Sequence, residues 1–148
     1  MSVANALKLD RIIESALYVN DSARSRKFYC EVLGLKPLLE TDTLCAFDVG
    51  GKNVLLIFQR GGSTQTQVLS GVGGASYGEI PPHDGSGPSH ICFAICAEQL
   101  RLWEARLTDC KIAIEGRMHW ARGGESIYFR DPDNHLLEFM TPGSWLIY

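Results

Sequence analysis

The sequence lacks the features that mark several large classes of protein. Its 14 Lys and Arg residues are outnumbered by 17 Asp and Glu residues, and the formal charge of −3 argues against a general nucleic-acid binder, which needs a basic face. No stretch is long and apolar enough to span a membrane, and the first ten residues lack the apolar core of a signal peptide. We therefore expect a cytoplasmic protein without nucleic-acid or membrane partners.

The cysteines also lack a pattern. There are five, an odd number, and their spacing is not that of a zinc site. Reduced thiols in a cytosol fit this arrangement best. Cys92 and Cys96 lie four residues apart in a predicted strand, too far to bridge each other, so we expect both to be small apolar residues of the core.

What the sequence does contain is one arrangement of elements written twice. The first unit is a strand, a helix and three strands, which we predict at residues 12–19, 23–33, 36–40, 44–49 and 53–59. Asp21 and Ser22 supply helix-capping chemistry before the helix, and Gly34 suits the left-handed position that ends one. Gly50-Gly51 predicts a tight hairpin between the last two strands.

The same order returns in the second half. We predict its strand, helix and three strands at residues 89–97, 98–107, 112–118, 126–130 and 136–141. Two such units pair about a pseudo-twofold axis and enclose a cavity with their concave sheet faces. The sequence therefore predicts an α+β fold of two βαβββ units that form a cupped mixed β-sheet, or half-barrels, with the helices packed outside.

The connection between the units breaks the pattern because it is dense in Gly, Ser and Pro. We predict an irregular segment there, and its composition leaves two interpretations open, a flexible flap over a site or a mobile linker without a role. The expected division of this single domain is an N-terminal tail, the first unit, the connection, the second unit and a C-terminal tail, at residues 1–11, 12–60, 61–88, 89–142 and 143–148.

A carboxylate stands in the middle of the last predicted strand. The turn Asp131-Pro132-Asp133-Asn134 folds the chain back, and Glu138 then sits between two apolar neighbours, either on a solvated face or aimed at a cation. Glu14 and His90 occupy equivalent places near the start of the first strand of each unit. Leu56 occupies the place in the first unit that Glu138 has in the second.

Three stretches in this order resemble the vicinal oxygen chelate superfamily, also called the glyoxalase/bleomycin resistance/extradiol dioxygenase superfamily. They are Leu17-Tyr18-Val19 followed by Ser25–Gly34 (SRKFYCEVLG), Ser89–Phe93 (SHICF), and Ser126–Glu138 (SIYFRDPDNHLLE). The resemblance covers nearly all of residues 12–142. It implies the paired βαβββ fold, a small-molecule substrate and, commonly, a homodimer.

The resemblance also implies a metal centre. Its ligand positions fall on Glu14, His90 and Glu138, whereas the fourth ligand of the glyoxalase I pattern falls on Leu56. One imidazole and two carboxylates suit a divalent ion such as Mn, Fe, Co, Ni or Zn. Three protein ligands leave open positions for water and substrate, as Lewis-acid catalysis requires. In many members the first-strand ligand comes from the partner subunit, and the sequence leaves open whether the site is shared or lies within one chain.

Other candidates surround this set. Glu14, Glu138 and Tyr128 are the candidate catalytic residues, although Tyr128 equally fits an exposed aromatic of the sheet. The candidate substrate-binding residues are Tyr18, His119, Trp120 and Arg130. His135, after the turn, is either a site residue or a loop histidine, and Trp145 in the tail packs over the cavity or over a partner subunit.

Several chemistries fit this resemblance. The leading hypothesis is a glyoxalase-like lyase or isomerase that binds two adjacent oxygens of a small substrate and stabilises an oxyanion or enediolate. Leu56 counts against true glyoxalase I, whose ligand glutamates also move protons. Glu14 in place of a histidine counts against an Fe(II) extradiol dioxygenase and against resistance to an epoxide antibiotic. A metal-free protein that sequesters a drug is the hypothesis from another class, and such proteins usually lack the ligand set.

Overall fold

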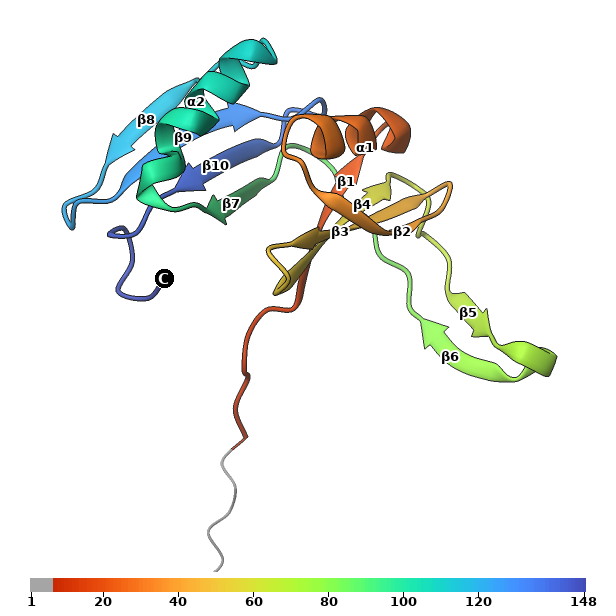
Figure 1. The fold of residues 1–148 in the computed structure, drawn as a ribbon. Helices are drawn as coiled ribbons and strands as arrows, with labels where there is room; N and C mark the ends of the chain where they lie inside the picture. The colour runs from red at the N-terminus through yellow and green to blue at the C-terminus, as the bar shows by residue number, and fades with distance from the viewer. Residues whose placement is uncertain (1–6) are drawn as a thin grey trace, which may run out of the picture.

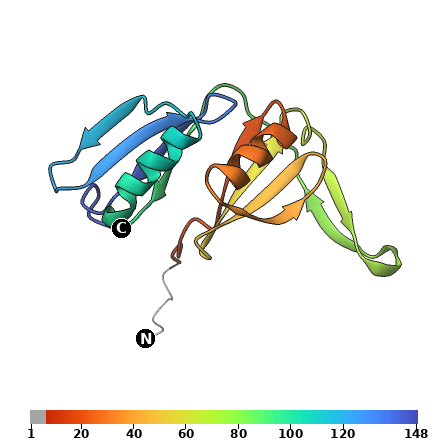
Figure 2. The same cartoon turned by 45° about the horizontal axis from the view of Figure 1, so that its top comes forward.

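Two four-stranded sheets, each covered by one helix, lie side by side in the computed structural model, which describes residues 7–148. In the first unit the elements are β1 (Glu14–Val19), α1 (Ser22–Glu31), β2 (Lys36–Glu40), β3 (Leu44–Val49) and β4 (Asn53–Gln59). In the second they are β7 (His90–Ala94), α2 (Leu100–Asp109), β8 (Gly116–His119), β9 (Glu125–Arg130) and β10 (Leu136–Met140), with a short 3₁₀ turn at Ala97–Gln99. Both helices lie on the same side of the molecule (Figures 1 and 2).

The two sheets repeat each other strand for strand. Their orders are β1-β4-β3-β2 and β7-β10-β9-β8, and in each the first strand is parallel to the fourth while the other neighbours are antiparallel. Ala16 lies beside Leu56 in the first sheet, and Cys92 lies beside Glu138 in the second. The predicted βαβββ fold is confirmed, and so is the equivalence of Leu56 with Glu138.

Alternating side chains separate the core from the concave faces. In β1, Leu17 and Val19 are buried on the helix side, where Phe28 and Tyr29 of α1 pack. The Asp21 side chain caps α1 by accepting from the Arg24 amide at 3.0 Å. The residues between these core positions face the other side of the sheet, which is where the candidate site lies.

Some predicted boundaries were wrong. Strands at 36–40, 44–49 and 53–59 agree to the residue, but the predicted helix 23–33 spans Ser22–Glu31 and the helix 98–107 starts two residues late and runs to Asp109. Lys111, which follows this helix, has a positive φ of 60°. The residues after it connect the helix to the sheet and are not part of a strand. The strand predicted at 112–118 therefore begins only at Gly116.

Cys92 and Cys96 were wrongly predicted in the core. Both are exposed in this chain. Ile91 and Phe93 take the core side of β7, so alternation turns Cys92 to the concave face, and Cys96 follows the end of the strand.

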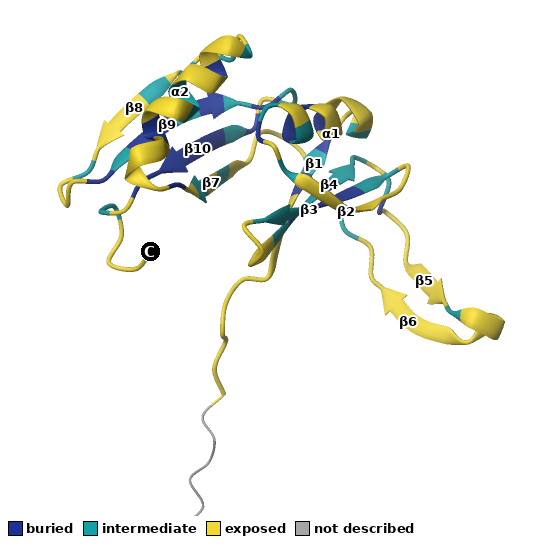
Figure 3. Ribbon diagram, in the orientation of Figure 1, coloured by how far each residue is buried: buried dark blue, intermediate teal, exposed yellow. Residues whose placement is uncertain are grey.

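The connection is not irregular throughout, which corrects the expectation for this segment. It contains a hairpin of β5 (Gln67–Ser70) and β6 (Ser76–Ile80), joined by a short turn at Val72–Gly74. Gly73 and Gly74 have φ of 77° and 78°, which glycine adopts without strain. We call residues 67–80 the arm; it projects away from both sheets and is largely exposed (Figures 1 and 3).

The turn at residues 131–135, which we call the clasp, fastens the second unit to the first. Asp131 accepts the Tyr29 hydroxyl at 2.8 Å. The buried side chain of Asp133 accepts the Asn20 amide at 2.8 Å, the Ser25 hydroxyl at 3.1 Å and the Arg24 guanidinium at 3.2 Å. The turn motif found in the sequence is therefore also the joint between the units.

His135 completes the clasp and is not a site residue. It is 1% exposed; its Nδ1 accepts the Ser89 amide at 2.8 Å and its Nε2 lies 2.9 Å from the Tyr18 carbonyl oxygen. A carbonyl only accepts, so Nε2 carries the proton and both ring nitrogens are satisfied. Of the two predictions for His135, the loop histidine agrees better with the structure than the site residue. The side chain bridges β1 to the start of β7.

Acid is expected to weaken the clasp through Asp133. Burial alone would raise the pKa of this carboxyl, but hydrogen bonds from Asn20, Arg24 and Ser25 hold it below its ordinary value. Such a group stabilises the fold above the unfolded-state pKa of about 3.9 and loses this contribution as the pH falls through the folded value. Urea unfolding should therefore show a steeper loss of stability below about pH 4 in wild type than in Asp133→Asn. Equal slopes would contradict this role.

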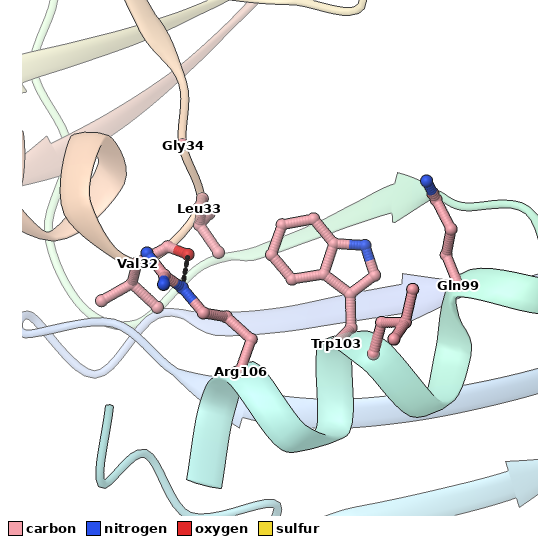
Figure 4. Close-up of a pocket in the computed structure, with 7 residues that line it drawn as sticks. Val32, Leu33, Gly34, Gln99, Trp103 and Arg106 are labelled. Atoms are coloured by element: carbon pink, nitrogen blue, oxygen red, sulfur yellow. Dashed lines mark hydrogen bonds between the residues drawn. The ribbon is translucent and has the colours of Figure 1, made fainter. Parts of the chain in front are cut away.

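A second joint lies on the outer, helix side. Arg106 of α2 donates to the carbonyl oxygens of Val32 and Glu31 at the end of α1. Beside it, an apolar groove of about 340 Å³ runs between the helices (Figure 4). Its lining residues are Val32, Leu33, Gly34, Gln99, Leu102, Trp103 and Arg106. Among residues 7–148, no helix is long and apolar enough to cross a membrane.

Candidate metal centre

A row of polar side chains crosses the concave face of the second sheet. Cys92 on β7, Glu138 on β10 and Tyr128 on β9 stand directly beside one another in the strand register. Glu138 is only 3% exposed although it lies on the face away from the core. His90 stands two residues before Cys92 and its ring stacks near that of Tyr128, with centroids 6.4 Å apart. The four side chains form one continuous polar surface.

The protons of His90 are constrained by its neighbours. Its Nδ1 lies 2.8 Å from the carbonyl oxygen of Leu136, so Nδ1 must carry the proton. In the neutral ring Nε2 is then a bare acceptor, and it faces the Oε2 atom of Glu138 at 3.2 Å. Two acceptors at this distance need a positive charge between them, from a proton on the ring or from a cation. Metal-bound histidines commonly donate their other ring nitrogen to a carbonyl in this way.

Glu138 has a second unmet requirement. Its Oε1 atom is buried and has no hydrogen-bond partner among the described residues. Although Cys92 as a whole residue is exposed, partial burial of its thiol group and the neighbouring Glu138 carboxylate raise the pKa of that thiol to about 12. The same two causes raise the pKa of Tyr128. Both groups therefore remain protonated at neutral pH.

The equivalent row of the first sheet is apolar. Ala16, Leu56 and Ala46 occupy the places that Cys92, Glu138 and Tyr128 have in the second sheet.

Glu14, at the start of β1, is exposed and belongs to the other sheet from His90 and Glu138. Within residues 7–148, no three His, Cys, Asp or Glu side chains gather closely enough to hold one ion. One chain therefore brings together His90 and Glu138 but not Glu14.

A groove of about 620 Å³ separates the units beside His90. Its walls are the start of β1, the β3–β4 hairpin and the exposed edge of β7. The lining residues are Ile12, Ser15, Val49, Gly50, Lys52, Asn53, Val54, Leu55, His90, Ile91, Cys92, Phe93 and Ala94. The edge strand that carries His90 is therefore open on the side of the first unit.

Tyr18 has a partner that the sequence pattern did not indicate. Its hydroxyl lies 2.7 Å from Nδ1 of His83, and both rings pack with Phe58. Burial and then the charge of Asp84 raise the pKa of Tyr18. His83 comes from the connection, and Gly85 lies so close to the Tyr18 ring that a Cβ there would stand 2.4 Å from it. The only signal in the sequence was a histidine in a segment poor in other functional groups.

Three other predicted substrate residues make their side-chain contacts with groups other than Glu138. Arg130 is paired with Glu115 at 3.0 Å, and the 80%-exposed side chain of His119 lies 3.5 Å from Glu125. Trp120 donates its ring N–H to Ser126 at 2.8 Å.

Trp145 in the tail is 70% exposed.

Comparisons with known proteins agree on the fold and differ in the reaction. The family model described as the Glyoxalase/Bleomycin resistance protein/Dioxygenase superfamily matches residues 8–139. The metallothiol transferase FosB of Bacillus licheniformis is 31% identical over 124 residues, which cover 83% of this chain and 70% of that protein. The catechol-2,3-dioxygenase of Bacillus subtilis is 30% identical over 82% of this chain but only 38% of its own length.

Solved structures extend the comparison. A lactoylglutathione lyase from Agrobacterium tumefaciens superposes with a TM-score of 0.79 and 28% identity, covering 94% of this chain and 98% of that one. The fosfomycin resistance protein FosX from Listeria monocytogenes, at 18% identity and a TM-score of 0.62, shares the fold. Three of these proteins are named as enzymes, a metallothiol transferase, a catechol dioxygenase and a lactoylglutathione lyase.

Proposed function

The chain belongs to the glyoxalase/bleomycin resistance/dioxygenase superfamily of enzymes, and we propose that it is a divalent-metal-dependent, glyoxalase-like enzyme of the lyase or isomerase type. Its substrate is a small molecule with two adjacent oxygens. The metal is held by His90 and Glu138 of one subunit and Glu14 of a second copy in a homodimer. The full-length likeness to a lactoylglutathione lyase supports this class of reaction.

One observation carries the proposal. When His90 is neutral, its Nε2 faces Oε2 of Glu138 at 3.2 Å as a second acceptor, and the other oxygen of the buried carboxylate has no partner among the described residues. A divalent cation would satisfy all three atoms, and an imidazole with carboxylates suits Zn, Ni, Mn, Co or Fe. When bound, such an ion supplies Lewis-acid stabilisation of a developing oxyanion.

The remaining residues divide the cavity into a polar and an apolar wall. Tyr128 keeps its proton and presents a hydroxyl donor beside Glu138, where it hydrogen-bonds an oxygen of the substrate. The facing wall, from the other subunit, carries Leu56 in the position of a fourth ligand. Because Leu56 cannot accept a proton, one carboxylate, either Glu14 or Glu138, would act alone as the base that transfers the proton.

A second candidate is thiol transfer to an epoxide antibiotic. The alignment covers 70% and 76% of two metallothiol transferases but only 38% of the catechol dioxygenase, at similar identity, and this favours thiol transfer over ring cleavage. Both candidates use the same metal centre, so they differ only in what chelates the ion. A panel of hemithioacetals on one side and fosfomycin with small thiols on the other separates them by turnover.

Metal content is the decisive measurement for the proposal. We expect close to one divalent ion per chain in the purified wild type and a loss of nearly all of it in His90→Ala, because the buried Glu138 is then left without its imidazole partner. Iron would favour a ring-cleaving dioxygenase, and Zn, Ni, Co or Mn a lyase or isomerase. If the wild-type protein holds no metal after soaking with divalent ions, the catalytic proposal is refuted and a small-molecule binding protein becomes the better interpretation.

A further inference from the structure

The arm exposes apolar side chains to an unusual degree. Val68 is 58% exposed, Leu69 48%, Tyr77 73% and Ile80 42%, and Val72 at the tip is 97% exposed. In the register Leu69 and Val68 point to opposite faces, so the arm is apolar on both. A two-stranded hairpin is marginally stable in water by itself. Contact with another surface would bury these side chains and stabilise the arm.

The charges of the connection limit which kinds of partner surface can contact the arm. Residues 61–88 contain no Lys or Arg, and their acidic residues are Glu79 and Asp84. Phosphate backbones and anionic lipid headgroups are recognised by cations, so neither matches this segment. An apolar surface on a protein matches it.

The position of the arm identifies that protein as a second copy of this chain. Directly after the arm, the connection is fixed over the concave face of the first sheet, where His83 bonds Tyr18 at 2.7 Å and the Arg60 guanidinium donates to Gly87 at 3.2 Å. Glu14 lies on that same face of β1 as Tyr18. Under the proposed function, the partner must bring its His90 and Glu138 to this face, because one chain holds only part of the ligand set among its described residues.

We infer that the arm of each subunit packs against the second unit of its partner and holds the dimer closed over the two metal centres. This inference rests on the proposed function for the choice of partner, but the arm itself contains no residue of the candidate centre. In a twofold dimer the arm is used twice, so each apolar residue contributes to two contacts.

Paired substitutions within one strand test the contact. The variants Val68→Asp and Leu69→Asp remove one apolar residue from each face, and Gln67→Glu and Ser70→Asp add the same charge at polar positions of β5. Sedimentation equilibrium gives the dimer dissociation constant of each. We expect the apolar variants to raise it by on the order of 100-fold, since each change acts twice, and the controls to raise it by less than about threefold.

Two further samples keep the result interpretable. A variant with residues 67–80 replaced by a short Gly-Ser linker should weaken the dimer at least as much while keeping the wild-type circular dichroism. Equal dissociation constants for apolar and control variants, or a wild type that is monomeric at micromolar concentration, would overturn the inference. Metal content measured on the same samples separates the two proposals. If the wild type is a metal-free dimer and the arm variants weaken it, the proposed metal centre is refuted and the arm contact is supported. If the wild type is a metal-loaded dimer and the arm variants leave its dissociation constant unchanged, only the arm contact is refuted.

Discussion

Glu138→Gln is expected to empty the metal centre and to lower turnover by at least about a thousandfold. The amide has nearly the shape of the carboxylate, so the buried site keeps its volume. It lacks the charge, however, and its NH₂ group would present hydrogens to the ion or to Nε2 of His90, which faces this position at 3.2 Å. Metal analysis and turnover under saturating metal measure the two effects. Glu115→Gln, at the exposed pair with Arg130, is the matched control and should change neither.

Mixing two inactive variants then shows where the site lies. If the ligand set is shared, Glu14→Gln and Glu138→Gln each inactivate both centres of a homodimer. In a heterodimer of the two, one centre combines an intact Glu14 with an intact Glu138. A 1:1 mixture that exchanges freely should therefore recover about a quarter of the wild-type sites, a count that follows from twofold symmetry. No recovery after unfolding and refolding the mixture together would show that each chain builds its own centre.

The sequence predicted the first unit better than the second for a local reason. β2, β3 and β4 are bounded by Gly34 and by Gly50-Gly51, whose φ values of 70°, 64° and 68° only glycine takes readily. The path from α2 to β8 has no such marker. It depends on Lys111, a non-glycine residue with positive φ, which no pattern in the sequence indicates.

Only those features of the site that depend on strand periodicity could be predicted from the sequence. The repeat related Leu56 to Glu138, which the strand registers confirm. Cys92 was expected in the core, although strand alternation turns its side chain to the face of Glu138. The Tyr18–His83 contact joins residues 65 positions apart through a connection without periodicity, so no local rule could find it. The exposed arm was missed for a similar reason, because its strands are four and five residues long and rich in glycine and serine.

The largest effect on stability is expected from His135→Ala. The substitution removes the donor to the Tyr18 carbonyl and the acceptor of the Ser89 amide, both at a site where the ring is 1% exposed. Each buried group left without a partner costs about 1–3 kcal/mol, and the lost ring adds a cavity, so we expect the free energy of unfolding to fall by about 3–4 kcal/mol. Urea denaturation at neutral pH measures this loss.

His83→Ala is the control for the clasp, because it also removes an imidazole that contacts Tyr18, but from a half-buried position in the connection. It should cost no more than about 1 kcal/mol. The turn itself survives in His135→Ala, since Asp131 still accepts the amide of residue 135 at 2.8 Å. A loss below about 1 kcal/mol in His135→Ala would mean that Asp131, Asp133 and the outer joint at Arg106 hold the units without this imidazole. A loss near the expected value would show that one buried imidazole fixes how the second sheet, with His90 and Glu138, is set against the first.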